Sequence, residues 1–459
     1  MQDAKLFQIY LVLYEKGQSG ARIVCPAGLW YSITIRSKPI GKKSGKGRHV
    51  MIKPDGHDEL RNPNMRRIFE CIRFNGPMTK KQIQSAAGLS WGCVSMLCAD
   101  LLKREILCEE KTPQATAGRT PACLEINSSK HLIVGLDAGF DHMTAVVTDL
   151  AGHILLCENR FIPDRSGKQI LPDIRAVIQS ILKQALQGSI VGIAVSLPGH
   201  MDAFRGGSVW AHLFGNFEPE RLSLIWEEEF GVPVLLCHAP DSMASAEHFF
   251  GAARDVNNFL FIQLSLGIGM GIMADGQIYR GKNGSAGELG HMTMNPRGER
   301  CHCGNYGCLE TFSSVESILR RCTEAVYAGK APLLRRHLDS GGQLTLATAA
   351  EAARSGDSYI KNIFLKAAHY AGIAVANAIN LIDPDAVVLG GELSGYRDIF
   401  LGRLTDTVKS HVWSGKTDLR AAQLGSNATA VGAASLLVPS VFSKLCESGA
   451  AGISSKDVT

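Results

Sequence analysis

Three cysteines and one histidine lie close together in this chain: His291 in Gly-Glu-Leu-Gly-His, then Cys301, Cys303 and Cys308 in Cys-His-Cys-Gly-Asn-Tyr-Gly-Cys. Three thiolates and one imidazole are a ligand set that tetrahedral zinc prefers, and the glycines permit tight bends around one point. The spacing therefore predicts a closed structural site with zinc as its cofactor. The alternative is a group of unligated core thiols, in a chain that holds 13 cysteines.

The same residues resemble the signature of the ROK family, which groups bacterial sugar kinases with sugar-responsive transcriptional repressors. The resemblance extends from about residue 61 to residue 438. It implies an α/β fold, in which an N-terminal winged helix-turn-helix precedes a two-lobed actin-like (ribonuclease H-like) ROK module. It also implies a sugar site, whose residues would be Glu288, His291 and Glu310, with Pro198, Gly199 and His238 closing the pocket. A plain loop and a solvated histidine are the alternatives for the last three.

The phosphate loops of the family's kinases are altered here. The first loop, Asp-x-Gly-Gly-Thr-Lys in the kinases, resembles Asp137-Ala-Gly-Phe-Asp-His-Met-Thr144, where Phe140 replaces a glycine, the lysine is missing and Asp141 adds a negative charge. Backbone N–H groups and a cation hold phosphates, so these changes oppose ATP binding. In the second loop Leu266 stands where the kinases place threonine.

The catalytic base of the kinases is also altered. Counting back from Glu247, the family's Asn-Asp pair falls on His238 and Ala239, and alanine cannot accept a proton from a sugar hydroxyl. Asp241 could take this role only with a shifted loop. We therefore predict a sugar-binding module without kinase activity.

Residues 61–127 predict a winged helix-turn-helix with its linker. Apolar residues at helical spacing begin at Met65, Thr79 caps a second helix with Ile83 and Ala86 inward, and Ser90 caps a third. Segments 106–110 and 123–126 would form the wing. The alternative is an ordinary three-helix bundle. The DNA-contact candidates are Ser90, Trp91, Ser95 and Met96 on the third helix, Arg73, Lys80 and Lys81 for phosphates, and Arg119 for a narrow minor groove, unless its Gly-Arg-Thr-Pro segment is a plain turn.

Buried strands alternate with helices after His131. We expect the first lobe at residues 128–235 and the second at 236–440, with the strand at 232–237 opening the second lobe and the last helix returning to the first. The expected strands are 132–137, 144–149, 152–156, 190–196 and 386–389, with a hairpin over 259–279, and the expected helices are 170–186, 242–251 and 359–381.

Charge is concentrated near the N-terminus. Residues 36–67 hold ten Lys/Arg against three acids, a net charge of +7, whereas the whole chain has +5, so the remainder carries −2. Such a segment favours a disordered basic leader at residues 1–60 that adds DNA affinity. Alternatively, translation starts near Met51. We expect a flexible tail over 441–459, and a cytoplasmic protein without membrane contact, since scattered cysteines indicate a reducing compartment and no long apolar run is present.

Together these features predict a sugar-responsive DNA-binding regulator, a repressor of carbohydrate-utilisation genes that sugar relieves. Its partners would be a double-stranded DNA operator, a small-molecule sugar effector and further copies of itself in a homodimer or homotetramer. The rival interpretation is an ATP-dependent sugar kinase with an appended DNA-binding domain. A third is a zinc-stabilised scaffold for protein interactions.

Overall fold

The computed structural model describes residues 21–24, 30–33, 63–110, 122–139, 142–162, 167–184, 188–197, 199–202, 208–210, 222–448 and 453–454. The chain divides into two units, Met1–Asp55 and Gly56–Thr459. In the first unit, strands β1 (Ala21–Val24) and β2 (Trp30–Ile33) pair antiparallel. The rest of the predicted basic leader lies outside the described residues. All that follows concerns the second unit.

The second unit begins with three helices: α1 (Pro63–Asn75), α2 (Lys80–Ala87) and α3 (Trp91–Lys103). Thr79 and Gln82 form a reciprocal capping box on α2, and Ser90 accepts a hydrogen bond from the Cys93 N–H at the start of α3. Gly88 ends α2 with a φ of +63°, a backbone conformation that favours glycine. Both predicted caps are therefore confirmed. In α2, Ala87 is buried in place of the predicted Ala86.

Helices α1 to α3 and a small sheet make up residues 63–126 of the second unit, which we call the N-terminal unit. The sheet has the order β3 (Met78–Thr79), β5 (Cys123–Ile126), β4 (Leu107–Glu109). The pairing of β4 with β5 is the predicted hairpin, whereas β3 was not predicted because two residues carry no alternating pattern. Residues 111–121, which include Arg119, lie outside the described residues.

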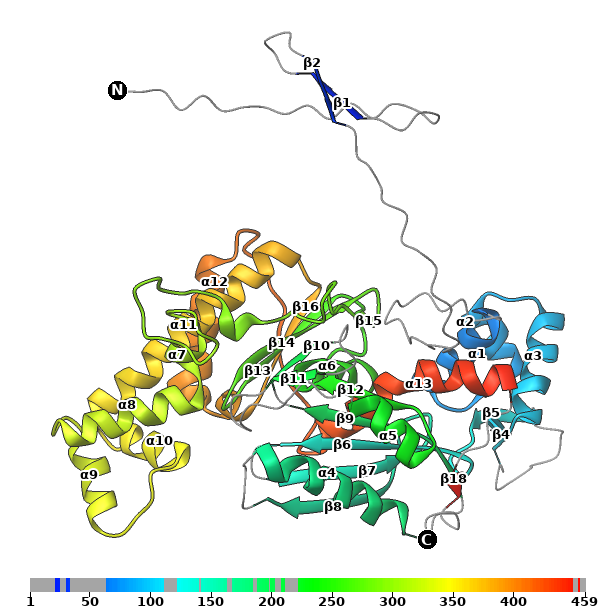
Figure 1. Cartoon of the computed structure of the whole chain (residues 1–459), viewed down its shortest axis with the longest axis horizontal. Helices are drawn as coiled ribbons and strands as arrows, with labels where there is room; N and C mark the ends of the chain where they lie inside the picture. The colour runs from blue at the N-terminus through cyan, green and yellow to red at the C-terminus, as the bar shows by residue number, and fades with distance from the viewer. Residues whose placement is uncertain are drawn as a thin grey trace. The chain divides into compact units, whose positions relative to one another are not determined.

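The first lobe is built on a sheet in the order β12-β9-β6-β7-β8, with β6 parallel to β9 and antiparallel to β7 (Figure 1). Its strands are β6 (His131–Ala138), β7 (His142–Thr148), β8 (Ile154–Phe161), β9 (Ser189–Leu197) and β12 (Val234–His238), and its helices are α4 (Gly167–Leu182) and α5 (Leu222–Phe230). The expectation that β12 opens the second lobe is wrong. It pairs parallel with β9 in the first sheet, because α5 provides the crossover between them.

The second lobe has a sheet in the order β15-β14-β13-β16-β17. The strands are β13 (Phe259–Leu264), β14 (Ile268–Ala274), β15 (Gln277–Ile278), β16 (Ala386–Gly390) and β17 (Leu419–Ala421). Helices α7 (Glu310–Ser313), α8 (Val315–Tyr327), α9 (Pro332–Asp339), α10 (Leu346–Arg354), α11 (Ser358–Ile382) and α12 (Gly402–His411) accompany it. Only α11 of these was predicted. Two sheets with flanking helices confirm the actin-like α/β class.

Two helices join the lobes. Helix α6 (Ala239–Phe250) packs on β13 and β14 of the second sheet, and α13 (Ala428–Ser448) packs on β6 and β9 of the first sheet. The two helices also pack on each other. By composition α13 could cross a membrane, but 67% of its apolar window is buried, as expected of a core helix.

The end of α13 corrects a prediction. We expected a flexible tail from residue 441, yet α13 continues to Ser448. The reason is that Val441, Phe442 and Leu445 are buried in one core with apolar side chains of α1. That core also includes residues of α2, α3, β6 and β9, so the N-terminal unit and the first lobe share a hydrophobic core.

Candidate functional site

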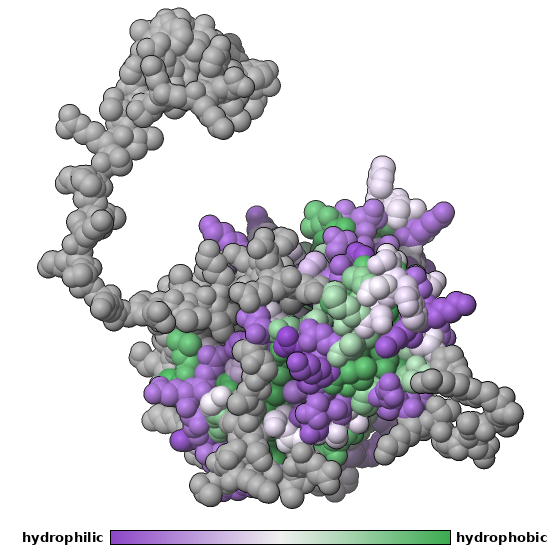
Figure 2. Space-filling view, turned by 90° about the vertical axis from the view of Figure 1, so that its right-hand side faces the viewer, coloured by the Kyte–Doolittle hydropathy of each residue, from purple (hydrophilic) through white to green (hydrophobic). Residues whose placement is uncertain are grey.

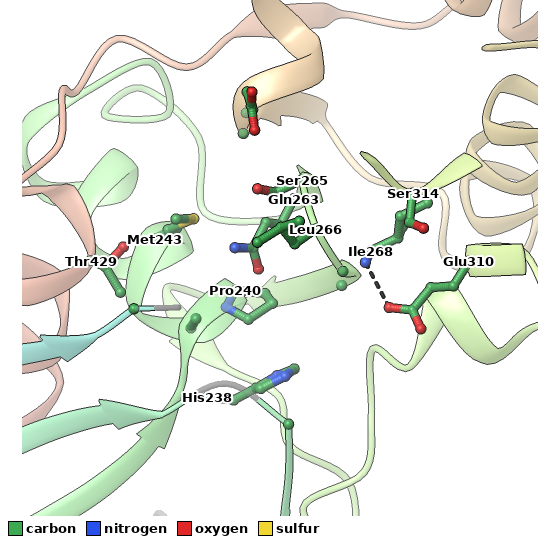
Figure 3. Close-up of a pocket in the computed structure, with 18 of the residues that line it drawn as sticks. His238, Pro240, Met243, Gln263, Ser265, Leu266, Ile268, Glu310, Ser314 and Thr429 are labelled. Atoms are coloured by element: carbon green, nitrogen blue, oxygen red, sulfur yellow. Dashed lines mark hydrogen bonds between the residues drawn. The ribbon is translucent and has the colours of Figure 1, made fainter. Parts of the chain in front are cut away.

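A cleft of about 1080 Å³ is lined by residues of both lobes (Figure 3). Glu288, His291, Glu310, His238 and Gly199 line it. Asp137, Gly139, Gly391 and Thr429 also line it. The predicted sugar residues therefore converge on one cavity, except Pro198, which lies outside the described residues.

Glu310 is the best defined of these side chains. It begins α7, where one carboxylate oxygen, Oε1, accepts a hydrogen bond of 2.8 Å from the Ile268 N–H; the dashed line in Figure 3 marks this bond. Its other oxygen, Oε2, lies 3.9 Å from Nδ1 of His291. Burial raises the pKa of the Glu310 carboxyl. The backbone therefore holds one oxygen, while the other faces histidine side chains at the cleft, where it could accept a hydrogen bond from a ligand hydroxyl.

His291 connects the cleft to the cysteines. Its Nδ1 is 3.7 Å from Sγ of Cys301, and its Nε2 is 3.9 Å from Oε2 of Glu288. Nδ1 thus faces both the Cys301 thiol and the Glu310 carboxylate, and Nε2 faces Glu288, another carboxylate that lines the cleft. This is the division of roles expected when a metal ligand also orients a binding site.

The ligand atoms of His291, Cys301, Cys303 and Cys308 all lie within 4.8 Å of one another. Tetrahedral zinc with Zn–S bonds of about 2.3 Å places sulfurs about 3.8 Å apart, and Sγ of Cys303 lies 3.7 Å from Sγ of Cys308. Burial, then the neighbouring thiols, raise the pKa of Cys308 to about 12. A bound cation would make such a thiol a thiolate at neutral pH. These residues therefore fit zinc.

His302 is a cleft residue that sequence reasoning missed. Its Nε2 lies 3.6 Å from Oε2 of Glu310, and its ring meets the His291 ring edge to face at 5.2 Å. With His291, Cys301 and Glu310 it forms a second possible ligand group. The three-cysteine set suits zinc better, because Glu310 is already held by Ile268. The position of His302 between Cys301 and Cys303 is the sequence feature that could have indicated its place in the site.

Asp137 lies near the C-terminal end of β6 and lines the cleft as well. Burial raises the pKa of its carboxyl to about 6, opposed by the charge of His142 and a hydrogen bond with Thr429. Leu266 also lines the cleft, while Phe140 and Asp141 lie outside the described residues.

Ala239 and Asp241 are the two positions considered for a catalytic base. Ala239 lines the cleft next to His238. Asp241 is buried, its Oδ2 lies 3.4 Å from Nε of Arg280, and it is not among the described residues that line the cleft. A carboxylate held against a guanidinium outside the cavity is badly placed to take a proton from a bound sugar.

The outward face of α3 is polar only in part. Trp91 is 53% exposed and Met96 65% exposed, and Ser90 is exposed although its hydroxyl caps the helix. Lys81 is exposed, while Lys80 and Ser95 are half-buried. The side of the molecule that carries α3 in Figure 1 faces the viewer in Figure 2, where apolar patches lie among hydrophilic side chains.

The prediction that Arg73 contacts phosphates is wrong. Its side chain is completely buried, because the last turn of α1 packs against the end of α6, where the guanidinium stacks 3.7 Å from the centre of the Phe249 ring. It therefore cannot reach DNA in this arrangement.

Comparisons with known proteins agree with this architecture. The model of the ROK family matches residues 133–439. The chain is 28% identical to the DNA-binding transcriptional dual regulator NagC of Escherichia coli K12, covering 77% of this chain and 86% of that protein. It is 28% identical to the xylose repressor of Bacillus subtilis 168, covering 83% and 96%.

Solved structures give the same grouping. A ROK family transcriptional regulator, described as a homologue of E. coli MLC protein, has a TM-score of 0.70 at 25% identity, covering 83% of this chain and 97% of its own. A ROK family glucokinase from Streptomyces griseus, solved with glucose and AMPPNP, has a TM-score of 0.58 at 28% identity. The glucokinase covers only 66% of this chain. The regulator thus accounts for more of the chain than the kinase does.

Proposed function

The chain belongs to the ROK family, and we propose that it is a sugar-responsive DNA-binding transcriptional regulator, a repressor that sugar releases from its operator. One observation carries this proposal: the helical N-terminal unit shares a hydrophobic core with a lobe of the module that holds the sugar cleft. A ligand that changes how the lobes close can therefore change how the N-terminal unit is presented to DNA.

The N-terminal unit would read DNA as a winged helix-turn-helix, with α3 in the major groove and the β4–β5 hairpin as the wing. Lys80 and Lys81 would contact phosphates, and Trp91, Ser95 and Met96 would face base edges. Arg119 is the candidate for the minor groove. A homodimer would present two such units to a pseudo-palindromic operator. We infer a cytoplasmic location, where such an operator is found.

The sugar would lie between Glu288, His291 and Glu310, with His238, Pro198 and Gly199 closing the pocket. Two carboxylates and an imidazole can each hydrogen-bond neighbouring hydroxyls, and a sugar that leaves one of them unpaired binds poorly. Zinc held by His291, Cys301, Cys303 and Cys308 would fix the imidazole. Its contribution is structural orientation of this wall of the cleft.

We propose no kinase activity for this chain. Support comes from Ala239 at the position of the family's catalytic base, from Leu266 in the second phosphate loop, and from Asp241, whose carboxylate is paired with Arg280 and is not among the described residues that line the cleft. Phosphoryl transfer depends on positioned phosphates and a base, and the residue changes named above oppose both requirements.

The test is capture of genomic DNA fragments by the purified full chain, without ATP, in parallel with a panel of monosaccharides. We expect selective capture that one sugar reduces. Capture of no preferred fragment under any condition would contradict the proposal. Formation of ADP with Mg-ATP and any sugar of the panel, lost in Asp241→Asn, would establish the kinase instead.

A further inference from the structure

Arg73 is a buried cation with almost no polar partner. Its side chain has no exposed surface, and none of its three guanidinium nitrogens has a hydrogen-bond partner in the described part of the chain. The nearest carboxylate oxygen, Oε2 of Glu70, lies 4.0 Å from Nη1 and is itself buried without a hydrogen bond. Burial lowers the pKa of Arg73 to about 10, so the group stays charged at neutral pH. A buried charge without hydrogen-bond partners costs free energy of folding.

Arg73 contacts α6, a helix that joins the two lobes. Its guanidinium lies 3.7 Å from the centre of the Phe249 ring on α6. Beside it, Phe74 packs against Phe249 with ring centroids 5.0 Å apart, and Nη2 of Arg254 donates a 2.9 Å hydrogen bond to the Phe74 carbonyl. The C-terminal turn of α1 is thus docked on the C-terminal end of α6. The cation–π attraction offsets only part of the desolvation cost.

The middle of α1 is held by a different helix. Phe69 packs on Phe442 of α13 with ring centroids 4.4 Å apart, and Cys446 approaches Met65. Arg104, which ends α3, donates a 2.8 Å hydrogen bond from Nη1 to the Leu445 carbonyl of α13. The contact of α1 itself with α13 is mainly apolar and lies in one hydrophobic core, in contrast to its contact with α6.

Helices α6 and α13 both start at the cleft and end at α1. His238 and Pro240, at the start of α6, and Ala428 and Thr429, at the start of α13, line the cleft. Helix α6 packs mainly on the second sheet, with a smaller contact to the first, whereas α13 packs on the first sheet, so a change in lobe closure would slide one helix along the other. That sliding is imposed on α1, which is attached to both helices.

We propose that Arg73 is a positioning residue for the DNA-reading unit: its stack on Phe249 is a joint poised to release, so that lobe closure undocks α1 from α6 while α1 stays on α13. A joint made with a poorly satisfied buried charge costs little to open, since water and Glu70 receive the guanidinium on release. This proposal rests on the proposed function, because the signal that opens the joint is sugar in the cleft.

The test uses Arg73→Met in the full chain, with Arg66→Met as the matched control. Arg66 lies on the same helix, has the same charge, and is paired with Glu70 at 3.9 Å in a half-buried position that solvent still reaches. Methionine fills the buried site without a charge, so it should hold the joint closed. Hydrogen exchange of the amides in the last turn of α1 is measured first, and then the ratio of DNA affinities without and with each monosaccharide of the panel.

We expect Arg73→Met to slow exchange in this turn by about tenfold or more, and to bring the affinity ratio close to one, while Arg66→Met changes neither. Phe249→Leu, which removes the ring beneath the guanidinium, should speed exchange in the same turn. Equal or faster exchange in Arg73→Met, a sugar response like that of the unaltered protein, or failure of the variant to fold would each overturn the proposal, because a merely structural arginine predicts them. If no sugar alters DNA binding by the unaltered protein, the proposed function fails, and the exchange rates alone decide whether the joint exists.

Discussion

Gly432 of α13 lies directly against the backbone carbonyl of Ser242 on α6: a Cβ atom added at Gly432 would meet that oxygen at 1.8 Å. The two helices that join the lobes can therefore pack this closely only with glycine here. We expect Gly432→Ala to lower the free energy of unfolding by about 1–3 kcal/mol, as overpacking does. Denaturant unfolding measures this. Gly92→Ala on α3, where nothing lies within 4 Å, should instead be neutral or stabilising by up to about 1 kcal/mol.

Removal of one thiol should remove the metal. We expect Cys308→Ser to lose bound zinc and to show reduced thermal stability, because a tetrahedral site loses much of its affinity for the metal when one of its four ligands is removed. Elemental analysis of the purified protein gives the zinc content. The control is Cys322→Ser, since Cys322 is buried in α8 away from the other thiols. Zinc retained at full occupancy in Cys308→Ser would exclude this ligand set.

A change of one atom in Glu310 should separate sugar binding from folding. In Glu310→Gln the amide oxygen can still accept the hydrogen bond from Ile268, so the loop is kept, but the charge facing the cleft is lost. We expect sugar affinity to fall at least about tenfold, the loss typical of a buried charge-assisted hydrogen bond. Calorimetry with the sugar found by the panel tests this, with exposed Glu351→Gln as control. Unchanged affinity would remove Glu310 from the site.

The exposed face of α3 should read thymine through its methyl group. Trp91 and Met96 are its large exposed side chains, and apolar atoms discriminate bases chiefly by contact with that methyl. We expect captured fragments to bind several-fold more weakly when amplified with deoxyuridine in place of thymidine, and Met96→Ala to reduce that difference. Binding is measured by mobility shift. Trp413→Ala, which alters an apolar side chain 94% exposed on the second lobe, should bind both DNAs like the unaltered protein.

Asp137 should make stability depend on pH. Its folded pKa of about 6 lies above its ordinary value of 3.8, so protonation favours the folded state, and this contribution is lost as pH rises through 6. Relative to Asp137→Asn, the unaltered protein should lose about 1 kcal/mol of unfolding free energy between pH 5 and pH 7. Denaturant unfolding across this range is the measurement. A difference between the two proteins that is constant with pH would show an unperturbed carboxyl.

The sequence was sufficient where a local rule decides the outcome. The caps at Thr79 and Ser90 follow from side-chain chemistry within one turn, and the clustering of His291 with three cysteines follows from ligand spacing. It was insufficient where the partner is distant along the chain. Arg73 has the sequence context of a surface cation, and only the approach of Phe249, far away in sequence, buries it.

The same limit explains the misplaced boundary between the lobes. The strand at Val234–His238 has no feature that tells which sheet it joins, since pairing with Ile193 and its neighbours is a long-range choice. His302 was overlooked because its importance comes from its distance to Glu310, which the intervening turn determines. Helices α8, α9 and α10 have buried inward residues but are not among the helices predicted from the sequence.

The packing of Phe442 on Phe69 bears on how DNA specificity could be exchanged among related proteins. If the N-terminal unit were expressed alone, ending at residue 127, its apolar side chains would lack the C-terminal turns of α13 and would be exposed to solvent. A chimaera that carries the N-terminal unit of a related protein would therefore also need the C-terminal turns of that protein's last helix, although the two segments lie at opposite ends of the chain. Among related proteins, residues of α1 and of the end of α13 should therefore vary together.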